Sequence, residues 1–223
     1  MRLFLPFITL GVAAALLAGC NNLADGPPES RLANYGAAPP SEHAVTVCHA
    51  YGCQRKTKVV FNGADVAAIS ALMQKTKKAD TPEEERRAVA YAVGWMETKS
   101  GEIIGTKSDR PGMDFRASGD PSQQDCVDEA MTTTGYLMFL YQRGLIKHHT
   151  VGGPVQKGKM LRGALEGNPV KYWPHWTAIL KENSNGQRWA VDSWIYENGE
   201  NPAVVKVEEW YIDDLNNLPK PAT

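Results

Sequence analysis

The sequence has almost no imbalance of charge, and this absence excludes a class of partners. Its 223 residues include 24 lysines and arginines against 25 aspartates and glutamates, for a formal net charge of −1. A chain this close to neutral offers no strongly basic surface, so nucleic-acid binding has no electrostatic support. Glycine-rich phosphate loops, zinc-protease signatures and internal repeats are also absent from the sequence. We therefore expect a chemistry that uses neither a phosphate loop nor a zinc ion.

A long apolar run lies at the N-terminus. Residues 3–18 are apolar, the only charge before them is that of Arg2, and Leu-Ala-Gly-Cys follows at residues 17–20. This pattern is typical of a secretory signal, and the run is too short to favour a lasting membrane span. The last four residues match the bacterial lipobox, which predicts cleavage after residue 19 and lipidation of Cys20. The alternative is an ordinary signal peptide followed by a chance cysteine.

The N-terminal features predict a location and a domain organisation. Several acyl chains on Cys20 would hold the protein on a membrane surface. We expect a lipoprotein of the bacterial cell envelope that faces the periplasm, on the outer rather than the inner membrane. Residues 20–43 are rich in proline, glycine and polar side chains, and predict a flexible tether. Residues 44–223 are long enough for a single domain with its own core.

The sequence contains four cysteines, and their positions separate their roles. Cys48 and Cys53 lie close enough to close a small loop, and an exported protein meets an oxidising compartment, so we predict a disulfide. The alternative is half of a metal site with His49, but no second ligand pair at metal spacing appears. We therefore expect no metal and no other cofactor. Cys126 is left without a partner, which indicates a reactive thiol.

Hydrophobic periodicity places helices before most of the strands. Helical spacing covers residues 65–77, 82–98 and 126–143, and strand-like runs cover residues 56–61, 175–181, 187–194 and 203–207. Ser100 and Gly101 mark the end of the second helix. Gly135, inside the third helix, costs about 1 kcal/mol relative to alanine and indicates a closely packed neighbour. Helices followed by an antiparallel sheet indicate the α+β class.

Cys126 stands at the start of the third helix, where Asp125 is the expected N-cap. A helix N-terminus favours the thiolate form of a cysteine. Asp125, Asp128 and Glu129 are close in sequence, however, and carboxylates near a thiolate raise its pKa. The mechanism therefore needs a cationic partner, and His175, at the start of a strand, is the candidate.

The length of one turn decides whether His175 can meet Asp192. If residues 183–186 form a four-residue loop, Asp192 lies opposite Thr177 and diagonal to His175 on the same face of the sheet, with Cβ atoms about 7–8 Å apart. If only residues 185 and 186 form the turn, Asp192 faces Ile179 and is too far from His175. The hypothesis requires the wider turn.

These residues suit a thiol acyl-transfer mechanism. Cys126 attacks a carbonyl carbon, and His175 takes the thiol proton and later protonates the leaving amine. Asp192 fixes the imidazole tautomer and stabilises its cation. The backbone N–H of Cys126, together with Gln123 or Gln124, would stabilise the oxyanion.

Three segments match a known pattern: Asp125-Cys126-x-Asp128 at a helix start, the strand from His175 to Leu180, and Trp189-Ala-Val-Asp192 on the next strand. They resemble the transglutaminase-like cysteine proteinase group of the papain-like superfamily, over residues 120–194. The resemblance implies a papain-like, transglutaminase-like core with N-terminal helices packed on an antiparallel sheet. It also implies a Cys126–His175–Asp192 triad. The Cys48–Cys53 loop and the first two helices have no place in that pattern.

Two histidines, a glycine-rich segment and four tryptophans also bear on the proposed site. The adjacent His148 and His149 are predicted to be exposed to solvent rather than a metal pair. The glycine-rich residues 152–167 suit either a mobile loop over the cleft or a plain connection. Four tryptophans flank the proposed site, and we expect core packing for most of them and a groove-lining role for one or two: Trp173, Trp176, Trp189 and Trp194.

The sequence thus predicts a membrane-tethered, thiol-dependent amide hydrolase or acyltransferase of the cell envelope. A thioester intermediate would be resolved by water or by an amine; hydrolysis is favoured because no dedicated amine site is visible. A protein or cell-wall peptide is the expected substrate, from location alone. The alternatives are a non-catalytic envelope lipoprotein that binds a protein or cell-wall partner, and a thiol redox protein, which would need a second cysteine near Cys126.

Overall fold

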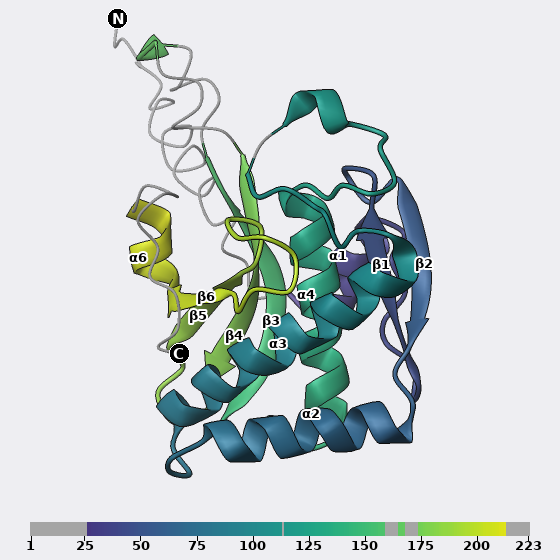
Figure 1. Cartoon of the computed structure of the whole chain (residues 1–223). Coiled ribbons are helices and arrows are strands. Elements are labelled where there is room, and N and C mark those ends of the chain that lie inside the picture. The colour runs from purple at the N-terminus through teal and green to yellow at the C-terminus, as the bar shows by residue number, and fades with distance from the viewer. Residues whose placement is uncertain (1–25, 113, 159–164, 168–173, 213–223) are drawn as a thin grey trace, which may run out of the picture.

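The structure, a computed structural model, describes residues 26–112, 114–158, 165–167 and 174–212. The predicted signal peptide, Cys20 and Trp173 lie outside these residues. In the described part, five α-helices pack against two antiparallel sheets (Figure 1). The predicted α+β class is confirmed. None of the described helices is long and apolar enough to cross a membrane.

The first two strands form one sheet and the next four form the other, so the described chain passes from one sheet to the other once. The helices are α1 (Pro28–Asn34), α2 (Gly63–Thr76), α3 (Pro82–Ile104), α4 (Cys126–Gln142) and α6 (Val207–Ile212), with a short 3-10 helix, η1 (Phe115–Ala117). One sheet pairs β1 (Ala44–His49) with β2 (Arg55–Val60). The other has the order β3 (His149–Lys157), β4 (His175–Glu182), β5 (Arg188–Asp192) and β6 (Ala203–Lys206).

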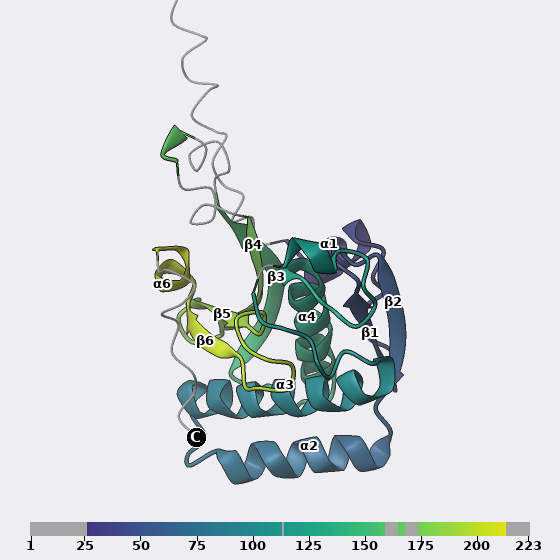
Figure 2. The same ribbon diagram turned by 45° about the horizontal axis from the view of Figure 1, so that its top comes forward.

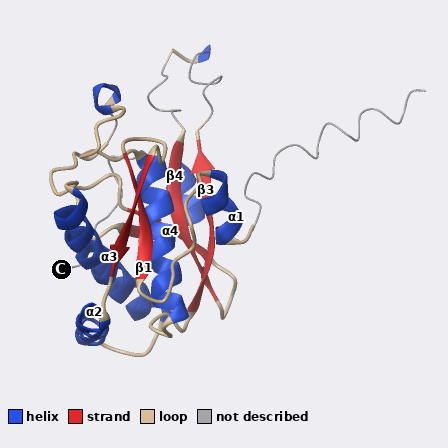
Figure 3. Ribbon diagram, turned by 90° about the vertical axis from the view of Figure 1, so that its right-hand side faces the viewer, coloured by secondary structure: helices blue, strands red, loops and turns tan. Residues whose placement is uncertain are grey.

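Helix α4 lies between the two sheets, with β1 on one side and β3 and β4 on the other (Figures 1 and 3). Residues 128–140 of this helix are all buried, as expected of a helix enclosed by the core. A Cβ atom added to Gly135 would lie 2.9 Å from Val45 Cγ1. The predicted close neighbour is therefore present, and it is strand β1.

The turn between β4 and β5 has the wider form that the site hypothesis requires. Ala178 pairs with Val191 and Ile179 with Ala190, and the N–H of Glu182 donates to the carbonyl of Gln187 at 2.8 Å. Residues 183–186 therefore form the loop. The register derived from the sequence is confirmed, and it brings His175 and Asp192 to the same face of the sheet.

The chain preceding Ala44 differs from the predicted tether. Helix α1 packs on β3 and α4, Leu32 is 1 % exposed, and the N–H of Gly153 donates to the carbonyl of Gly26 at 3.1 Å. The packed part of the chain thus begins before Ala44, because a single short apolar face is enough to anchor a helix of seven residues.

Strand β3 occupies part of the segment predicted as a loop. The interpretation of residues 152–167 as a mobile loop is wrong for residues 152–157, while residues 159–164 lie outside the described part. Gly152 belongs in the strand because a Cβ atom there would lie 2.9 Å from Ile179 Cγ2. A register shift between Gly152 and Val155 accommodates Pro154, which has no N–H to donate.

Helix α3 is longer than predicted and packs along α2 (Figure 2). It passes through Gly101 and ends at Gly105, which has a φ of +88°. Gly101 is a contact rather than a stop: a Cβ atom there would lie 2.5 Å from Asn198 Oδ1. This close approach positions the loop that follows Asp192.

Candidate active site

The first turn of α4 presents Cys126 as the sequence predicts. Asp125 is the N-cap, and its Oδ1 accepts from the N–H groups of Val127 and Asp128 at 3.1 and 2.9 Å. Asp128 Oδ2 accepts in return from the N–H of Asp125 at 3.1 Å. The two aspartates thus form a reciprocal capping box around the helix start. Cys126 is 6 % exposed and has no disulfide partner.

The sulfur of Cys126 lies against the backbone on either side of His175. Its thiol donates to the carbonyl of Pro174 at 3.8 Å, and the backbone N–H of Trp176 hydrogen-bonds to the sulfur. Cys126 therefore meets residues 48 and 50 positions further along the chain, where α4 packs on β4.

His175 and Asp192 form a buried pair. His175 Nε2 and Asp192 Oδ2 are 2.6 Å apart, and both side chains are 1 % exposed. The indole Nε1–H of Trp210 donates to the same carboxylate oxygen at 2.7 Å. The imidazole also contacts two indole rings, that of Trp194 at 4.6 Å and that of Trp210 at 5.4 Å between centroids. The expected histidine–aspartate hydrogen bond is present, in surroundings closed by aromatic rings.

The bond between the thiol and the imidazole is not formed in this structure. Among the described residues, His175 Nδ1 and Asp192 Oδ1 are buried without a hydrogen-bond partner. The thiol uses the carbonyl of Pro174 instead. Cys126 thus lies against the backbone next to His175, His175 bonds to Asp192, and Nδ1 of its ring has no partner among the described residues.

The surroundings of the thiol favour its protonated form. Burial raises the pKa of Cys126 well above its usual range, and the carboxylates of Asp125 and Asp192 raise it further. The N–H of Trp176 acts in the opposite direction. The helix N-terminus therefore does not ionise this thiol by itself, in agreement with the expectation that a cationic partner is needed.

The two glutamines proposed for the oxyanion site are engaged with the backbone. Gln123 Nε2 donates to the carbonyls of Ser108 and Ser122, both at 3.1 Å. Gln124 Nε2 donates to the carbonyl of Cys48 at 2.8 Å. Both side chains are almost completely buried. In this structure they hold the loop that precedes α4.

The predicted disulfide between Cys48 and Cys53 is present. His49 is not available for a metal, because its Nδ1 bonds to the carbonyl of Pro121 at 2.8 Å and its Nε2 to Thr57 Oγ1 at 3.0 Å. Ligand atoms of Cys48, Cys53 and Asp128 do lie within 4.8 Å of one another. Both sulfurs are joined in the disulfide, however, so neither is a thiolate ligand.

Three buried carboxyl groups next to the site were missed by sequence reasoning. Burial raises the pKa of Glu97 and of Asp109 to about 7. Burial and the neighbouring Glu97 raise the pKa of Glu129 well above its usual range. Glu129 lies one helical turn after Cys126, and the N–H of Gly199 donates to Glu97 Oε2 at 3.3 Å. Acidic side chains usually face water, whether on a helix, as for Glu97 and Glu129, or in a loop, as for Asp109, so no local pattern predicts this burial.

Among the histidines and tryptophans near the sheet, His149 has an environment different from the one expected. His148 bonds to Asp80 at 2.9 Å and is partly exposed, but His149 is completely buried, so the prediction of an exposed pair is wrong for His149. Trp194 contacts His175. Trp189 instead lies under the guanidinium of Arg86, 3.6 Å from the ring centroid. Trp176 is half-buried and packs edge-on against the ring of Tyr35.

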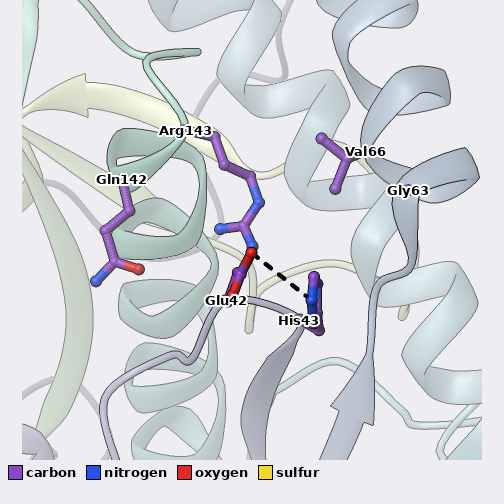
Figure 4. A pocket seen from close by; sticks show the side chains of 6 residues that line it. All are labelled: Glu42, His43, Gly63, Val66, Gln142 and Arg143. Carbon is purple, nitrogen blue, oxygen red and sulfur yellow. Dashed lines mark ion pairs between the residues drawn. The ribbon is translucent and has the colours of Figure 1, made fainter.

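A separate open pocket lies at the other end of α4 (Figure 4). Its volume is about 550 Å³, and it is lined by Glu42, His43, Gly63, Val66, Gln142 and Arg143. The ion pair between Glu42 and His43 on its rim is largely exposed. This pocket contains no nucleophile and lies a whole helix length away from Cys126, so it does not belong to the thiol site.

Comparison with known proteins gives no match to a family model, a curated protein or a solved structure. Any statement about activity therefore depends on the residues of the site.

Proposed function

We propose that this protein is a thiol-dependent amide hydrolase or acyltransferase, with a transglutaminase-like, papain-like arrangement of Cys126, His175 and Asp192. The observation that carries the proposal is the buried His175–Asp192 hydrogen bond of 2.6 Å, with Nδ1 of the same ring left open beside the backbone that holds the thiol. A purely structural buried histidine would be expected to have both nitrogens paired.

The geometry supports a role for each of these side chains. In the proposed mechanism, Nε2–H of His175 donates a hydrogen bond to the Asp192 carboxylate, so Nδ1 is the basic nitrogen of the neutral ring. When the thiol turns from the Pro174 carbonyl to Nδ1, the imidazole takes its proton and the sulfur attacks the amide carbonyl carbon. The Nδ1 proton then passes to the leaving amine as the C–N bond breaks. Water, deprotonated by Nδ1, resolves the thioester to a carboxylate and regenerates the thiol.

The fold supports these roles. The thiol stands at the N-terminal end of α4, and the other two residues stand on the adjacent strands β4 and β5, which pack against this helix. The rings of Trp194 and Trp210 shield the imidazole, and Trp210 also shares the carboxylate of Asp192. Low exposure strengthens the interaction of Asp192 with an imidazolium.

The place of action and the substrate follow from the N-terminal sequence. A protein tethered to the bacterial envelope through a lipid on Cys20 would act on a protein or cell-wall peptide within reach of the membrane. The disulfide between Cys48 and Cys53 agrees with an extracytoplasmic location. We favour water over an amine as the acceptor, since water is always present at such a site.

One observation favours the non-catalytic alternative, an envelope lipoprotein that binds a protein or cell-wall partner. The thiol lies against the Pro174 carbonyl and burial raises its pKa, so this arrangement also suits a small buried side chain. The two functions differ in whether the imidazole can ionise the sulfur.

The rate of iodoacetamide labelling at Cys126, measured against pH by peptide mapping, tests the proposal. An enzyme should show labelling at pH 6 that His175→Ala lowers about 100-fold, because a positioned base contributes on the order of 10²-fold or more. His148→Ala, which changes a partly exposed histidine, is the matched control and should leave the profile unchanged. A thiol that titrates near 8.5 or above, with no response to His175→Ala, would refute the proposed function.

A further inference from the structure

The loop closed by the disulfide has an unfavourable backbone. Four consecutive residues lie in the left-handed region: Ala50 with a φ of 71°, Tyr51 with 69°, Gly52 with 61° and Cys53 with 59°. Three of them carry a Cβ atom, and side-chain-bearing residues rarely adopt this conformation. Such backbone persists only where other contacts hold it, and it is found most often at functional sites.

The contacts that hold this loop come from the start of the nucleophile helix. The N–H groups of Tyr51 and Cys53 donate to the two oxygens of Asp128 at 2.7 and 2.6 Å. The N–H of Gly52 donates to Asp125 Oδ2 at 3.0 Å. Successive backbone N–H groups in such a turn form a concave anion-binding nest. Here the bound anions are the two carboxylates on either side of Cys126.

Other hydrogen bonds extend the contact between the loop and α4. The N–H of Cys48 donates to Thr132 Oγ1 at 3.0 Å, and its carbonyl accepts from Gln124 Nε2 at 2.8 Å. The N–H of Ala50 donates to the carbonyl of Gln123 at 2.9 Å. The loop thus holds both the segment that leads to Cys126 and the first two turns of its helix.

These contacts also act on the charge around the thiol. Asp125 and Asp128 oppose ionisation of Cys126. The N–H dipoles of the loop offset part of this negative charge. Without them, the start of α4 would lose the three donors that hold the side chains of Asp125 and Asp128 in place on either side of Cys126.

We propose that the Cys48–Cys53 loop is a positioning element of the thiol site. The reactivity of Cys126 then depends on the disulfide between Cys48 and Cys53. This inference rests on the proposed thiol chemistry. Reduction by a dithiol would transfer two electrons and two protons to the disulfide, giving two cysteine thiols and an oxidised reductant. The freed loop would leave its left-handed conformation and withdraw the three N–H donors. The thiol of Cys126 would therefore be reactive in an oxidising compartment, where the disulfide is intact, and less reactive in a reducing one.

The double variant Cys48→Ala/Cys53→Ala in the full chain tests the dependence. The measured quantity is the ratio of the Cys126 labelling rates at pH 6 and pH 9 with iodoacetamide, because a ratio cancels changes in access to the thiol. We expect the ratio to fall at least tenfold relative to wild type. A folded variant, judged by near-UV circular dichroism, with an unchanged ratio would overturn the inference.

A second measurement decides the matter if the double variant does not fold. Wild-type protein is equilibrated with dithiothreitol of increasing reducing strength, the reductant is removed rapidly, and all three cysteines of the site region are followed on separate peptides. The ratio at Cys126 should fall in step with the reduced fraction of Cys48 and Cys53. A constant ratio while the disulfide becomes reduced would refute the dependence.

Including His175→Ala in the same series separates the two proposals. If His175→Ala lowers the ratio and loss of the disulfide does not, the proposed function stands and the positioning role of the loop fails. If His175→Ala has no effect, the proposed function itself fails, and the inference about the loop fails with it.

Discussion

Two buried histidine–carboxylate pairs have their histidines in the same sheet, on β3 and β4, but the carboxylate of the first comes from helix α3 and that of the second from strand β5. His149 Nδ1 lies 2.9 Å from Glu85 Oε1, and both side chains are completely buried. His175 Nε2 lies 2.6 Å from Asp192 Oδ2, with both side chains 1 % exposed. By residue type, distance and burial the pairs are nearly equivalent.

Their remaining hydrogen-bonding groups set them apart. Glu85 also accepts from the N–H groups of Lys147 and His148, at 2.7 and 2.9 Å. His149 Nε2 accepts from Arg86 at 3.3 Å. The first pair is therefore saturated.

In the second pair, Nδ1 of His175 and Oδ1 of Asp192 have no partner among the described residues. Open polar atoms beside a thiol, rather than burial or pairing alone, distinguish the candidate catalytic pair from the structural one.

The largest effect on stability is expected at the saturated pair. Glu85→Ala would leave His149 and the backbone N–H groups of Lys147 and His148 without their acceptor, at a cost of about 3–5 kcal/mol in the free energy of unfolding. Urea denaturation measures it, and Glu85→Gln, which retains one acceptor oxygen, should cost less. The labelling ratio at Cys126 should be unchanged while the protein is folded; a loss as large as that of His175→Ala would remove the distinction between the pairs.

The next effect concerns the open pair. Asp192→Asn keeps the size of the side chain and an oxygen for the indole of Trp210, but it cannot stabilise an imidazolium as a carboxylate does. We expect labelling of Cys126 at pH 6 to fall on the order of 10–100-fold, with a smaller loss of stability than for Glu85→Ala. The opposite ranking, with little change in labelling and a large loss of stability, would make this pair structural as well.

A smaller effect should follow from removing one donor to that carboxylate. Trp210→Phe deletes the indole N–H that lies 2.7 Å from Asp192 Oδ2, and a hydrogen bond to a charged group contributes about 1.5 kcal/mol or more. Trp189→Phe is the matched control, because the Trp189 indole nitrogen has no partner among the described residues. Thermal unfolding should show the greater loss for Trp210→Phe; equal losses would mean that ring packing alone matters.

The smallest effect concerns the carboxyl groups behind the site. The pKa of Glu97 rises from 4.5 to about 7 in the folded protein, so between these values the folded state keeps a proton that the unfolded chain has released. Stability should therefore fall as the pH rises through this window. In Glu97→Gln, the decrease in the free energy of unfolding between pH 5 and pH 8 should be smaller than in the wild type by about 1 kcal/mol.

Melting temperatures at the two pH values measure this change, and Glu102→Gln, at an exposed position of the same helix, is the control.

The pH dependence of stability contributed by Glu85 has the opposite sign. Although burial alone would raise it, hydrogen bonds from His149 and from two backbone N–H groups lower its pKa. Its contribution to stability is therefore lost as the pH falls below about 4.5.

Several elements around the site could be predicted because local patterns decide them. The apolar stripe and the aspartate cap define α4. The loop at residues 183–186 sets the register of β4 and β5, and with it the meeting of His175 and Asp192. Periodicity and turn chemistry act within a few residues, so they can be read directly from the chain.

Other elements depend on partners far away in sequence and could not be predicted. Gly152 lies in a strand because Ile179 packs where its side chain would be, and Gly101 lies inside a helix because Asn198 approaches it. Taken locally, both glycines indicate a loop or the end of a helix. The burial of His149 depends on its pairing with Glu85. The role of Trp210 at the site depends on its hydrogen bond to Asp192. No local pattern contains these pairings.

The enclosure of α4 has a consequence for how the site would be switched. Strand β1 approaches this helix at Gly135, and β3 and β4 pack on its opposite side, so the helix cannot tilt without disturbing both sheets. Under the proposed mechanism, the sulfur would move from the Pro174 carbonyl to the imidazole by rotation about the Cα–Cβ bond of Cys126. A single torsion angle would separate the resting from the attacking form, and a ligand that captures the Pro174 carbonyl oxygen would release the thiol without any movement of the scaffold.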